Sequence, residues 1–301
     1  ELPMHASRRV STLRAALAVL IPWFTGGERS WAERVRIEDV PDKSMQEGLL
    51  FVQSGRLAEA EAAFSRLLES QPSYASAWSN RGQARMDQGK YKAAVSDFST
   101  AIELAPEAPL PYANRGGALF HVYDEQRDPQ LLTNARIDCL NAVRLDPNVD
   151  LAYYNLGEIW KRDALRSDAY NFQTTKWLQA ADAYREASEV APNMQLFSLK
   201  RSLALFEGGA VSEAQQVLSS LVRKYPAYAE GNNALAAILA SCNQPYEAQR
   251  VLARVSRYEK EEEEDAVSAP MRYADSHEWP PRIAQAFKEL CARQGVGVVP
   301  L

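Results

Sequence analysis

The residues best suited to chemistry are few and scattered in this chain of 301 residues. Three histidines and three cysteines are present: His5, His121, His277, Cys139, Cys242 and Cys291. No histidine has another histidine or a cysteine at metal-ligand spacing, and the cysteines form no C-x-x-C pair. We therefore predict no metal site and no cofactor, and we expect the cysteines to pack as small buried side chains.

Motifs for nucleophilic, nucleotide-dependent or metal-dependent catalysis are also missing from the sequence. It contains no G-x-S-x-G, H-E-x-x-H, G-x-x-x-x-G-K-[ST] or G-x-G-x-x-G pattern. Among 39 acidic residues, no carboxylate pair stands out as a general acid and base. We assign no catalytic residue and predict a non-enzymatic protein. An enzyme with its site in the two insertions described below is the alternative, as is a regulatory subunit of an enzyme complex.

Composition limits the classes of partner. The formal net charge is -5, with 24% charged and 46% hydrophobic residues. Nucleic acid is not an expected partner, because phosphate contact requires an excess of Lys and Arg. The longest apolar run covers residues 15–24, which is shorter than the roughly 20 residues that span a bilayer. We expect a protein or peptide partner, with any membrane association occurring through that partner.

A repeat of 34 residues organises the middle of the chain. Five residue types recur at this constant offset: Gly48, Gly55, Ala60, Phe64 and Pro72 return as Gly82, Gly89, Ala94, Phe98 and Pro106. The first Gly and the Ala allow two antiparallel helices to approach closely, the second Gly ends the first helix, and the Phe fills the space between them. The Pro begins the link to the next unit because it cannot continue a helix.

This pattern resembles the tetratricopeptide repeat (TPR) family, whose unit is a helix-turn-helix of 34 residues. The resemblance covers residues 41–258 as about six repeats. It implies an all-α fold, a right-handed α-α superhelix in which the first helices line a concave groove. It also implies a protein-interaction scaffold or adaptor.

In each repeat, the residue two positions before the first-helix Gly is expected to face this groove. Asn80, Asn114 and Asn155 hold this position in three successive repeats. An amide both donates and accepts hydrogen bonds, which suits the backbone of an extended peptide. Asn is also common at this position in the family, so a role without a ligand is the alternative. The other groove-facing candidates are Gln83, Asp87, His121, Tyr154, Glu158 and Arg162.

Repeats three and four exceed the standard length by seven and eleven residues, in segments of about 121–135 and 162–177. Insertions in repeat proteins often emerge on one face and carry binding. The aromatic candidates for such a surface are Tyr123, Tyr170, Phe172 and Trp177. Alternatively, these rings pack the longer helices onto their own repeats, and the sequence favours neither interpretation.

Two segments follow the repeats. Residues 259–274 begin with an acidic run and are interpreted as a linker. Residues 275–301 carry helix signals, with Pro281 in the first turn and Ile283 and Phe287 on one face. We expect this C-terminal helix to cap the array, because a stack of repeats exposes an apolar face at its end. Docking of Trp279 to a partner is the alternative.

Residues 1–32 have the order of an export signal. Arg8 and Arg9 precede the apolar run, and Ala32 ends a small-x-small cleavage site. The order resembles a twin-arginine signal, which directs bacterial export and entry to the thylakoid lumen. A buried N-terminal helix is the alternative. Residues 33–40 are expected to be a linker.

The C-terminal sequence WPPRIAQAFKEL is similar to the tail of TPR proteins of the thylakoid lumen in plants and algae. Together with the signal, this resemblance leads to a specific expectation. The chain is a non-enzymatic TPR scaffold of the thylakoid lumen that aids assembly or maintenance of photosynthetic complexes. A bacterial periplasmic TPR scaffold is the alternative.

Overall fold

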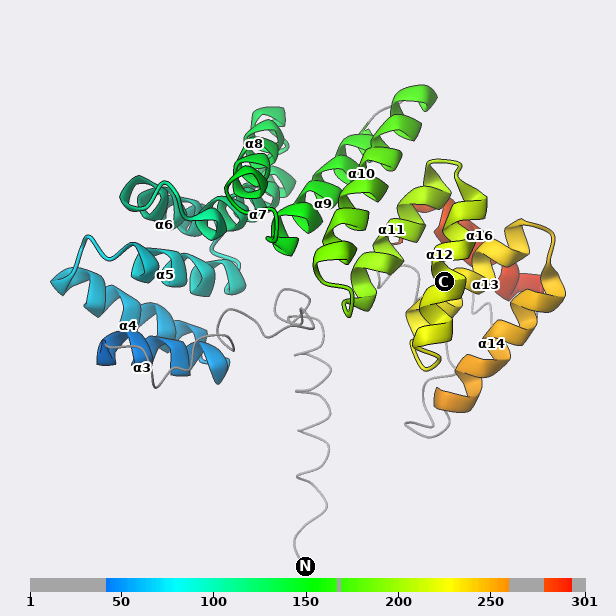
Figure 1. The fold of residues 1–301 in the computed structure, drawn as a ribbon, viewed down its shortest axis with the longest axis horizontal. Coiled ribbons are helices and arrows are strands. Elements are labelled where there is room, and N and C mark those ends of the chain that lie inside the picture. Colours follow the sequence, from blue (N-terminus) through cyan, green and yellow to red (C-terminus); the bar gives the residue numbers. More distant parts are fainter. Residues whose placement is uncertain (1–41, 167–168, 260–278, 294–301) are drawn as a thin grey trace, which may run out of the picture. The chain divides into compact units, whose positions relative to one another are not determined.

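The computed structural model describes residues 42–166, 169–259 and 279–293. Every regular element in these ranges is a helix (Figure 1). In chain order they are α3 (Lys43–Gln53), α4 (Leu57–Ser70), α5 (Ala75–Asp87), α6 (Tyr91–Leu104), α7 (Pro109–Gln126), α8 (Pro129–Leu145), α9 (Asp150–Arg166), α10 (Tyr170–Val190), α11 (Gln195–Glu207), α12 (Val211–Lys224), α13 (Ala229–Ser241), α14 (Pro245–Glu259) and α16 (Pro281–Arg293). The predicted all-α fold class is confirmed. Helices α3 to α14 form repeats one to six, each with a first and a second helix.

Glycines end the first helices of repeats one, two and five. Gly55, Gly89 and Gly209 have φ angles of 72°, 75° and 84°, in the left-handed region that favours glycine. No atom lies within 4 Å of the position that a Cβ would take at any of the three. Backbone conformation, and not lack of space, therefore explains these glycines, as the sequence interpretation predicted.

A second set of glycines lets the two helices of a repeat approach closely. A Cβ on Gly48 would lie 2.3 Å from Cε1 of Phe64, and one on Gly82 would lie 2.9 Å from Cε1 of Phe98. Both phenylalanine side chains are fully buried. The predicted roles of the glycine and the phenylalanine, as a close approach and its filling, are confirmed in repeats one and two.

The described chain divides into two compact units. Unit 1 contains residues up to 159 together with 189–194, and unit 2 contains residues 160–188 and those from 195 onward. Helix α9 begins in unit 1 and ends in unit 2. In unit 1 the apolar side chains form clusters between successive helices, for example Met45, Leu49 and Phe64 between α3 and α4.

The extra residues of repeats three and four lengthen their helices. In repeat three, α7 has 18 residues and α8 has 17, whereas α5 and α6 have 13 and 14. The turn between α7 and α8 contains only Arg127, with φ of 60°, and Asp128, whose Oδ1 accepts from the Gln130 backbone N–H at 2.9 Å. In repeat four, α9 has 17 residues and α10 has 21. The predicted insertions therefore lie largely within helices.

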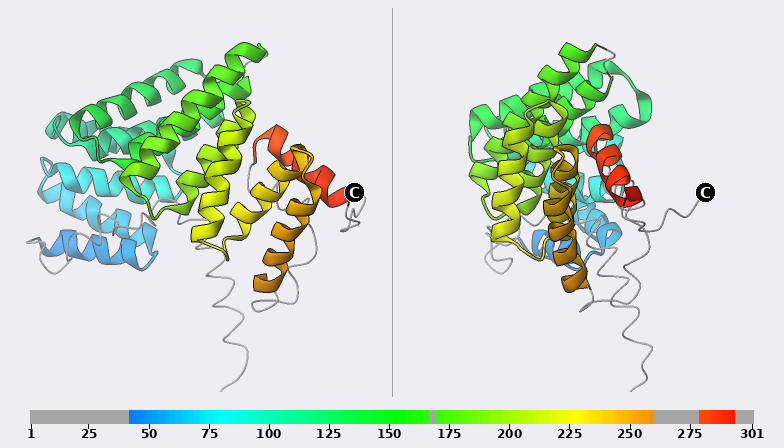
Figure 2. Two further views of the ribbon diagram at one scale, coloured as in Figure 1. Left: turned by 45° about the vertical axis from the view of Figure 1, so that its right-hand side comes forward. Right: turned by 90° about the vertical axis from the view of Figure 1, so that its right-hand side faces the viewer.

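Helix α16 packs on the first helices of repeats five and six, α11 and α13. Figure 2 shows it in red beside the yellow and orange helices of unit 2. Its buried face contains Ile283, Phe287, Leu290 and Cys291. The predicted C-terminal helix is thus present, and it covers first helices of the array.

Some predicted features lie outside the described residues. These are the targeting residues Arg8, Arg9 and Ala32, the linker 33–40, most of the acidic linker, and the side chain of Tyr170. Among the helices that are described, none combines the length and apolar character needed to cross a membrane.

Candidate functional site

The predicted groove residues lie on first helices of repeats two to four, and most are partly exposed. In α5, the Asn80 amide donates from Nδ2 to Sδ of Met45 in the preceding repeat, at 3.5 Å. Arg162 belongs to the part of α9 that lies in unit 2. The half-buried candidates are Asn80, Gln83, Asp87, Asn114, His121, Tyr154, Glu158 and Arg162.

Asn155 differs from the other two predicted asparagines, because its side chain is only 3% exposed. Its Nδ2 donates to the backbone carbonyl of Ala113 in α7, at 3.0 Å. A Cβ on Gly117 would lie 3.1 Å from the same Nδ2, so this glycine leaves room for the amide. Asn155 therefore joins α9 to α7, which is a different role from the predicted contact with a peptide.

Three predicted groove residues share one cluster in unit 1. Gln83 donates from Nε2 to Oδ1 of Asp87 at 2.7 Å, one turn further along α5. The His121 ring of α7 stacks on Tyr91, the first residue of α6, with ring centroids 4.5 Å apart and an interplanar angle of 11°. Asp87 acts electrostatically on Tyr91. We call Gln83, Asp87, Tyr91 and His121 the α5–α7 cluster.

The environment of the α5–α7 cluster is negative. Burial raises the pKa of Asp87 to about 6, although the hydrogen bond from Gln83 opposes the shift. The pKa of Tyr91 is also raised, first by burial and then by the charges of Glu125, Asp124 and Asp87. The charges of three carboxylates thus act on the tyrosine hydroxyl.

One basic side chain lies beside this group of carboxylates. Nη1 of Arg127 is 3.7 Å from Oδ1 of Asp124, and the Arg127 side chain is 63% exposed. An ion pair with so exposed a partner is weak and contributes at most about 1 kcal/mol.

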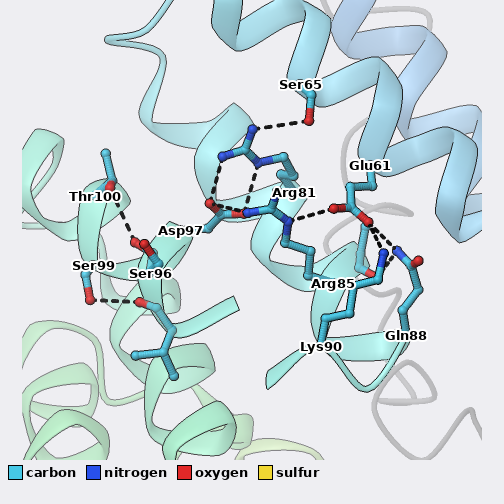
Figure 3. Close-up of polar contacts among 12 residues, drawn as sticks. Glu61, Ser65, Arg81, Arg85, Gln88, Lys90, Ser96, Asp97, Ser99 and Thr100 are labelled. Atoms are coloured by element: carbon cyan, nitrogen blue, oxygen red, sulfur yellow. Dashed lines mark hydrogen bonds and ion pairs between the residues drawn. The ribbon is translucent and has the colours of Figure 1, made fainter. Parts of the chain in front are cut away.

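An ion-pair network fixes the other side of α5 (Figure 3). Arg81 donates from Nε and Nη2 to the two oxygens of Asp97 in α6, at 3.0 and 2.8 Å. Its Nη1 donates to Oγ of Ser65 in α4, at 3.2 Å. Arg85 donates from Nη1 to both Asp97 oxygens at 2.9 Å, and from Nε to Oε1 of Glu61 at 2.9 Å. The network therefore joins repeats one and two.

Glu61 is the second acceptor of the network. Burial alone would raise its pKa, but hydrogen bonds from Lys90, Arg85 and Gln88 outweigh burial and lower the pKa to about 2. Lys90 Nζ and Gln88 Nε2 donate to Glu61 Oε2 at 2.7 and 3.1 Å. This carboxylate is therefore ionised at neutral pH.

The next repeat contains the same arrangement. Arg115 of α7 donates from Nε and Nη2 to the two oxygens of Asp138 in α8, at 2.7 and 2.8 Å. Its Nη1 donates to Oγ of Ser99 in α6, at 3.1 Å. In both repeats, the arginine joins the second helix of its own repeat to the second helix of the preceding one. We call these two arrangements the arginine latches.

Sequence reasoning missed the latches, although two of their three residues recur at the repeat offset. Ser65 and Arg81 recur as Ser99 and Arg115, 34 residues later, but Asp97 and Asp138 are 41 residues apart because repeat three is longer. A search that allowed for the seven extra residues would have found the third member.

The aromatic insertion candidates fall into two groups. Tyr123 is 2% exposed in unit 1 and Trp177 is 4% exposed in unit 2, so these two rings follow the packing alternative. Phe172 is 49% exposed, and Lys176 Nζ lies 4.9 Å from its ring centroid. A lysine stacked on an exposed ring is typical of a solvated helix surface.

The described residues contain no candidate metal site. Within the described ranges, no group of three or more His, Cys, Asp or Glu side chains is arranged to hold a metal ion. The α5–α7 cluster provides hydrogen-bonding groups, negative charge and aromatic faces. Such groups are suited to non-covalent recognition.

Comparison with known proteins places these helices in a wider context. A protein-family model of the tetratricopeptide repeat matches residues 45–109 and 172–229. The small glutamine-rich tetratricopeptide repeat-containing protein 2 of Mycosarcoma maydis is 31% identical over 123 residues. That match covers 41% of this chain and 29% of the relative.

Solved structures share the fold at low sequence identity. PilF of Pseudomonas aeruginosa is similar with a TM-score of 0.57 and 18% identity, over 83% of this chain and 96% of that one. A chain of the APC/C hetero-tetramer Cut9–Hcn1 has a TM-score of 0.56 and 14% identity, over 84% and 44%. A tetratricopeptide repeat protein of Parabacteroides merdae has a TM-score of 0.54 and 17% identity, over 85% and 93%.

Proposed function

The chain carries tetratricopeptide repeats, and from this premise we propose that it is a non-catalytic scaffold that binds a segment of a partner protein. The binding surface is the inner face, defined as the surface of the first helices that turns away from the second helices. Stacked repeats present such a surface as an extended site for a peptide.

The α5–α7 cluster is the observation that supports this proposal. The arginine latches and the buried glycine contacts hold α5 and α7 against the second helices. Gln83, Asp87 and His121 are nevertheless partly exposed. Polar groups on a rigid element, outside the core that the element needs for its own packing, are suited to recognising a ligand.

The charge of the cluster indicates the chemistry of the partner. The charges of Asp87, Asp124 and Glu125 act on Tyr91, whose ring stacks on His121. A Lys or Arg side chain of a peptide gains both ionic attraction and contact with an aromatic face in such a place. We therefore propose a partner segment that carries a basic residue.

A peptide array tests this function directly. The full-length protein, fluorescently labelled, is applied to random 12-residue peptides, and the bound sequences are compared with the unbound ones. We expect enrichment of Lys or Arg, and loss of about tenfold in affinity for the selected peptides in Asp87→Asn and His121→Ala, since each removes one part of a shared contact. Glu59→Gln, at an exposed position on α4, is the matched control. Selection of acidic peptides, or unchanged binding by both variants, would contradict the proposal.

The asparagines give a second test of the same surface. Asn80→Ala and Asn114→Ala are each expected to lower the affinity for the selected peptides several-fold if the two amides hydrogen-bond the peptide backbone. Asn155→Ala is expected to lower thermal stability instead, because its amide bonds Ala113. Unchanged peptide affinity in the first two variants would show that these amides do not contribute to peptide binding.

We also propose the thylakoid lumen as the compartment, where the partner takes part in assembly or maintenance of photosynthetic complexes. The support is the order of Arg8, Arg9, the apolar run and Ala32, together with the C-terminal resemblance. Fractionation of chloroplasts and N-terminal sequencing of the endogenous protein test it. A mature start at Glu33 is expected, whereas a start before Arg8 would contradict the export signal, and a bacterial source would favour the periplasm.

A further inference from the structure

Helix α16 occupies the inner face of repeats five and six. It packs on the first helices α11 and α13 of unit 2, which correspond within their repeats to the first helices that the proposed function uses in unit 1. All nine residues from Gly231 to Leu239 of α13 are buried. A first helix with an open inner face alternates between buried and exposed positions, as α5 does. The continuous burial of α13 therefore reflects cover on both of its sides.

Polar contacts position the start of α16 on this face. The Trp279 indole donates from Nε1 to Oε1 of Glu230 in α13, at 3.2 Å. The Ile283 backbone N–H, in the first turn of α16, donates to Oε1 of Glu207 in α11 at 2.8 Å. An acidic side chain is favourable at a helix N-terminus, where backbone N–H groups lack intrahelical partners. Two carboxylates from two repeats thus recognise one helix start.

Arg282 adds a third contact. It donates from Nη1 to the backbone carbonyl of Phe206 at 2.6 Å, and its guanidinium lies 4.4 Å from the Phe206 ring centroid. The carbonyl belongs to the last turn of α11 and also accepts from the Gly209 backbone N–H at 3.1 Å, in the turn that follows the helix. A cation is favourable at this end of a helix.

The rest of α16 is held by apolar contact. Ile283, Phe287 and Leu290 are at most 3% exposed, and the Trp279 and Phe287 rings are 5.2 Å apart. A single helix of 13 residues is marginal in water without such contacts. Helix α16 therefore depends on the inner face for its order, in the manner of a helical ligand in a groove.

We propose that α16 is an intramolecular ligand of the inner face of repeats five and six, and that this face also binds a partner helix of the same chemistry. Such a partner is amphipathic and begins with an indole, two prolines and an arginine. This inference rests on the proposed function, because it assigns the same use of first helices to unit 2. The two ligands exclude each other, so the resident α16 lowers the apparent affinity for the partner helix by the fraction of chains that are open.

A competition experiment with the full-length protein tests the inference. The probe is a fluorescein-labelled peptide with the sequence of residues 279–293 and Cys291 replaced by Ser. The variant Trp279→Ala/Phe287→Ala loses both rings that hold α16 in place, and we expect it to bind the probe at least tenfold more tightly than the unmodified chain. Arg282→Ala, which removes only one polar contact, is expected to give a smaller gain of about threefold. Gln285→Ala, exposed on α16 and donating to Glu289 of the same helix, is the matched control.

Hydrogen exchange gives the independent readout. In the unmodified chain, the α16 amides are expected to exchange faster than those of α11 and α13, because α16 opens without unfolding of the repeats. Exchange of α16 only together with the repeats, or equal probe affinity in all variants, would overturn the proposal. Circular dichroism measures whether each variant is folded. If the double variant does not fold, the comparison of Arg282→Ala with the unmodified chain still tests the proposal.

The outcome is separable from that of the proposed function. Probe binding in unit 2 does not involve Asp87 or His121, so the peptide array can fail while the probe binds. Conversely, basic-peptide binding with no probe binding would leave the proposed function intact and remove this inference.

Discussion

Arg81 and Asp97 form a bidentate ion pair in which Asp97 is only 1% exposed. Arg85 donates to the same two oxygens, so this carboxylate has two cations of α5 as partners. Because Ser65 accepts from Arg81, the pair also sets the position of the preceding repeat. The latch therefore holds the first helix while its other side stays partly exposed.

Replacing Asp97 by Ala is expected to destabilise the protein by about 3–5 kcal/mol, because two guanidinium groups are then left without their buried partner. Urea unfolding followed by circular dichroism measures this change. The exposed pair Arg56–Glu59 supplies the control, since Glu59→Ala is expected to cost less than about 1 kcal/mol. Equal losses in the free energy of unfolding for both variants would show that the latch stabilises the protein no more than an exposed ion pair does.

Gly48→Ala tests the close approach of α3 and α4. The added Cβ would lie 2.3 Å from Cε1 of Phe64, a side chain that is fully buried. Overpacking of this kind costs about 1–3 kcal/mol. The double variant Gly48→Ala/Phe64→Leu is expected to recover part of that loss relative to the sum of the two single changes. Strict additivity of the three thermal unfolding measurements would contradict the proposed contact.

Much of the fold follows from Gly, Ala, Phe and Pro at one offset, because these residues act within a single helix pair. The latches were not predicted, since Asp138 is displaced by the extra residues of repeat three. The structure of repeat three could not be predicted from the offset either: the extra residues extend α7 and α8, and only Arg127 and Asp128 remain as a turn. The 34-residue offset predicts contacts within a helix pair, but it no longer aligns residues that follow an insertion.

The position of α16 required more than local pattern. Its own sequence predicted a helix with one apolar face, yet the surface that covers this face lies on α11 and α13, far away in the chain. The sequence of α13 could have indicated this cover, because ALAAIL (residues 234–239) is apolar on every side of a helix. Such a helix must be covered all round. Among the groove candidates, the burial of Asn155 was also beyond local pattern: its amide lies where a Cβ on Gly117 of the neighbouring repeat would be only 3.1 Å away.

The three cysteines are expected to differ in reactivity. Burial raises the pKa of Cys139 well above its usual range and that of Cys291 to about 11, whereas Cys242 is half-exposed. Since the thiolate is the reactive form, iodoacetamide at pH 8 is expected to modify Cys242 first. Mass spectrometry of tryptic peptides over time measures the order. Modification of Cys139 as fast as Cys242 in the folded protein would contradict its buried position in α8.

Asp87 is expected to make stability depend on pH. Its pKa is raised from 3.8 to about 6, mainly by burial, so the folded chain holds this proton more tightly than the unfolded chain. Between pH 4 and 6 the folded state therefore binds more protons at this site. The contribution of Asp87 to the free energy of unfolding falls as the pH rises through that window, and it is constant above it.

Asp87→Asn removes this cost of ionisation. We expect the variant to be more stable by about 1–2 kcal/mol at pH 7.5, with the gain shrinking toward zero below pH 4. Urea unfolding at pH 4, 5, 6 and 7.5 measures the difference, with the exposed Glu107→Gln as a control. A gain that is the same at every pH would mean that the carboxylate is not destabilised by burial. Higher stability combined with weaker binding of basic peptides is the pattern expected of a residue kept for recognition, because binding sites often retain groups that the fold alone would not favour.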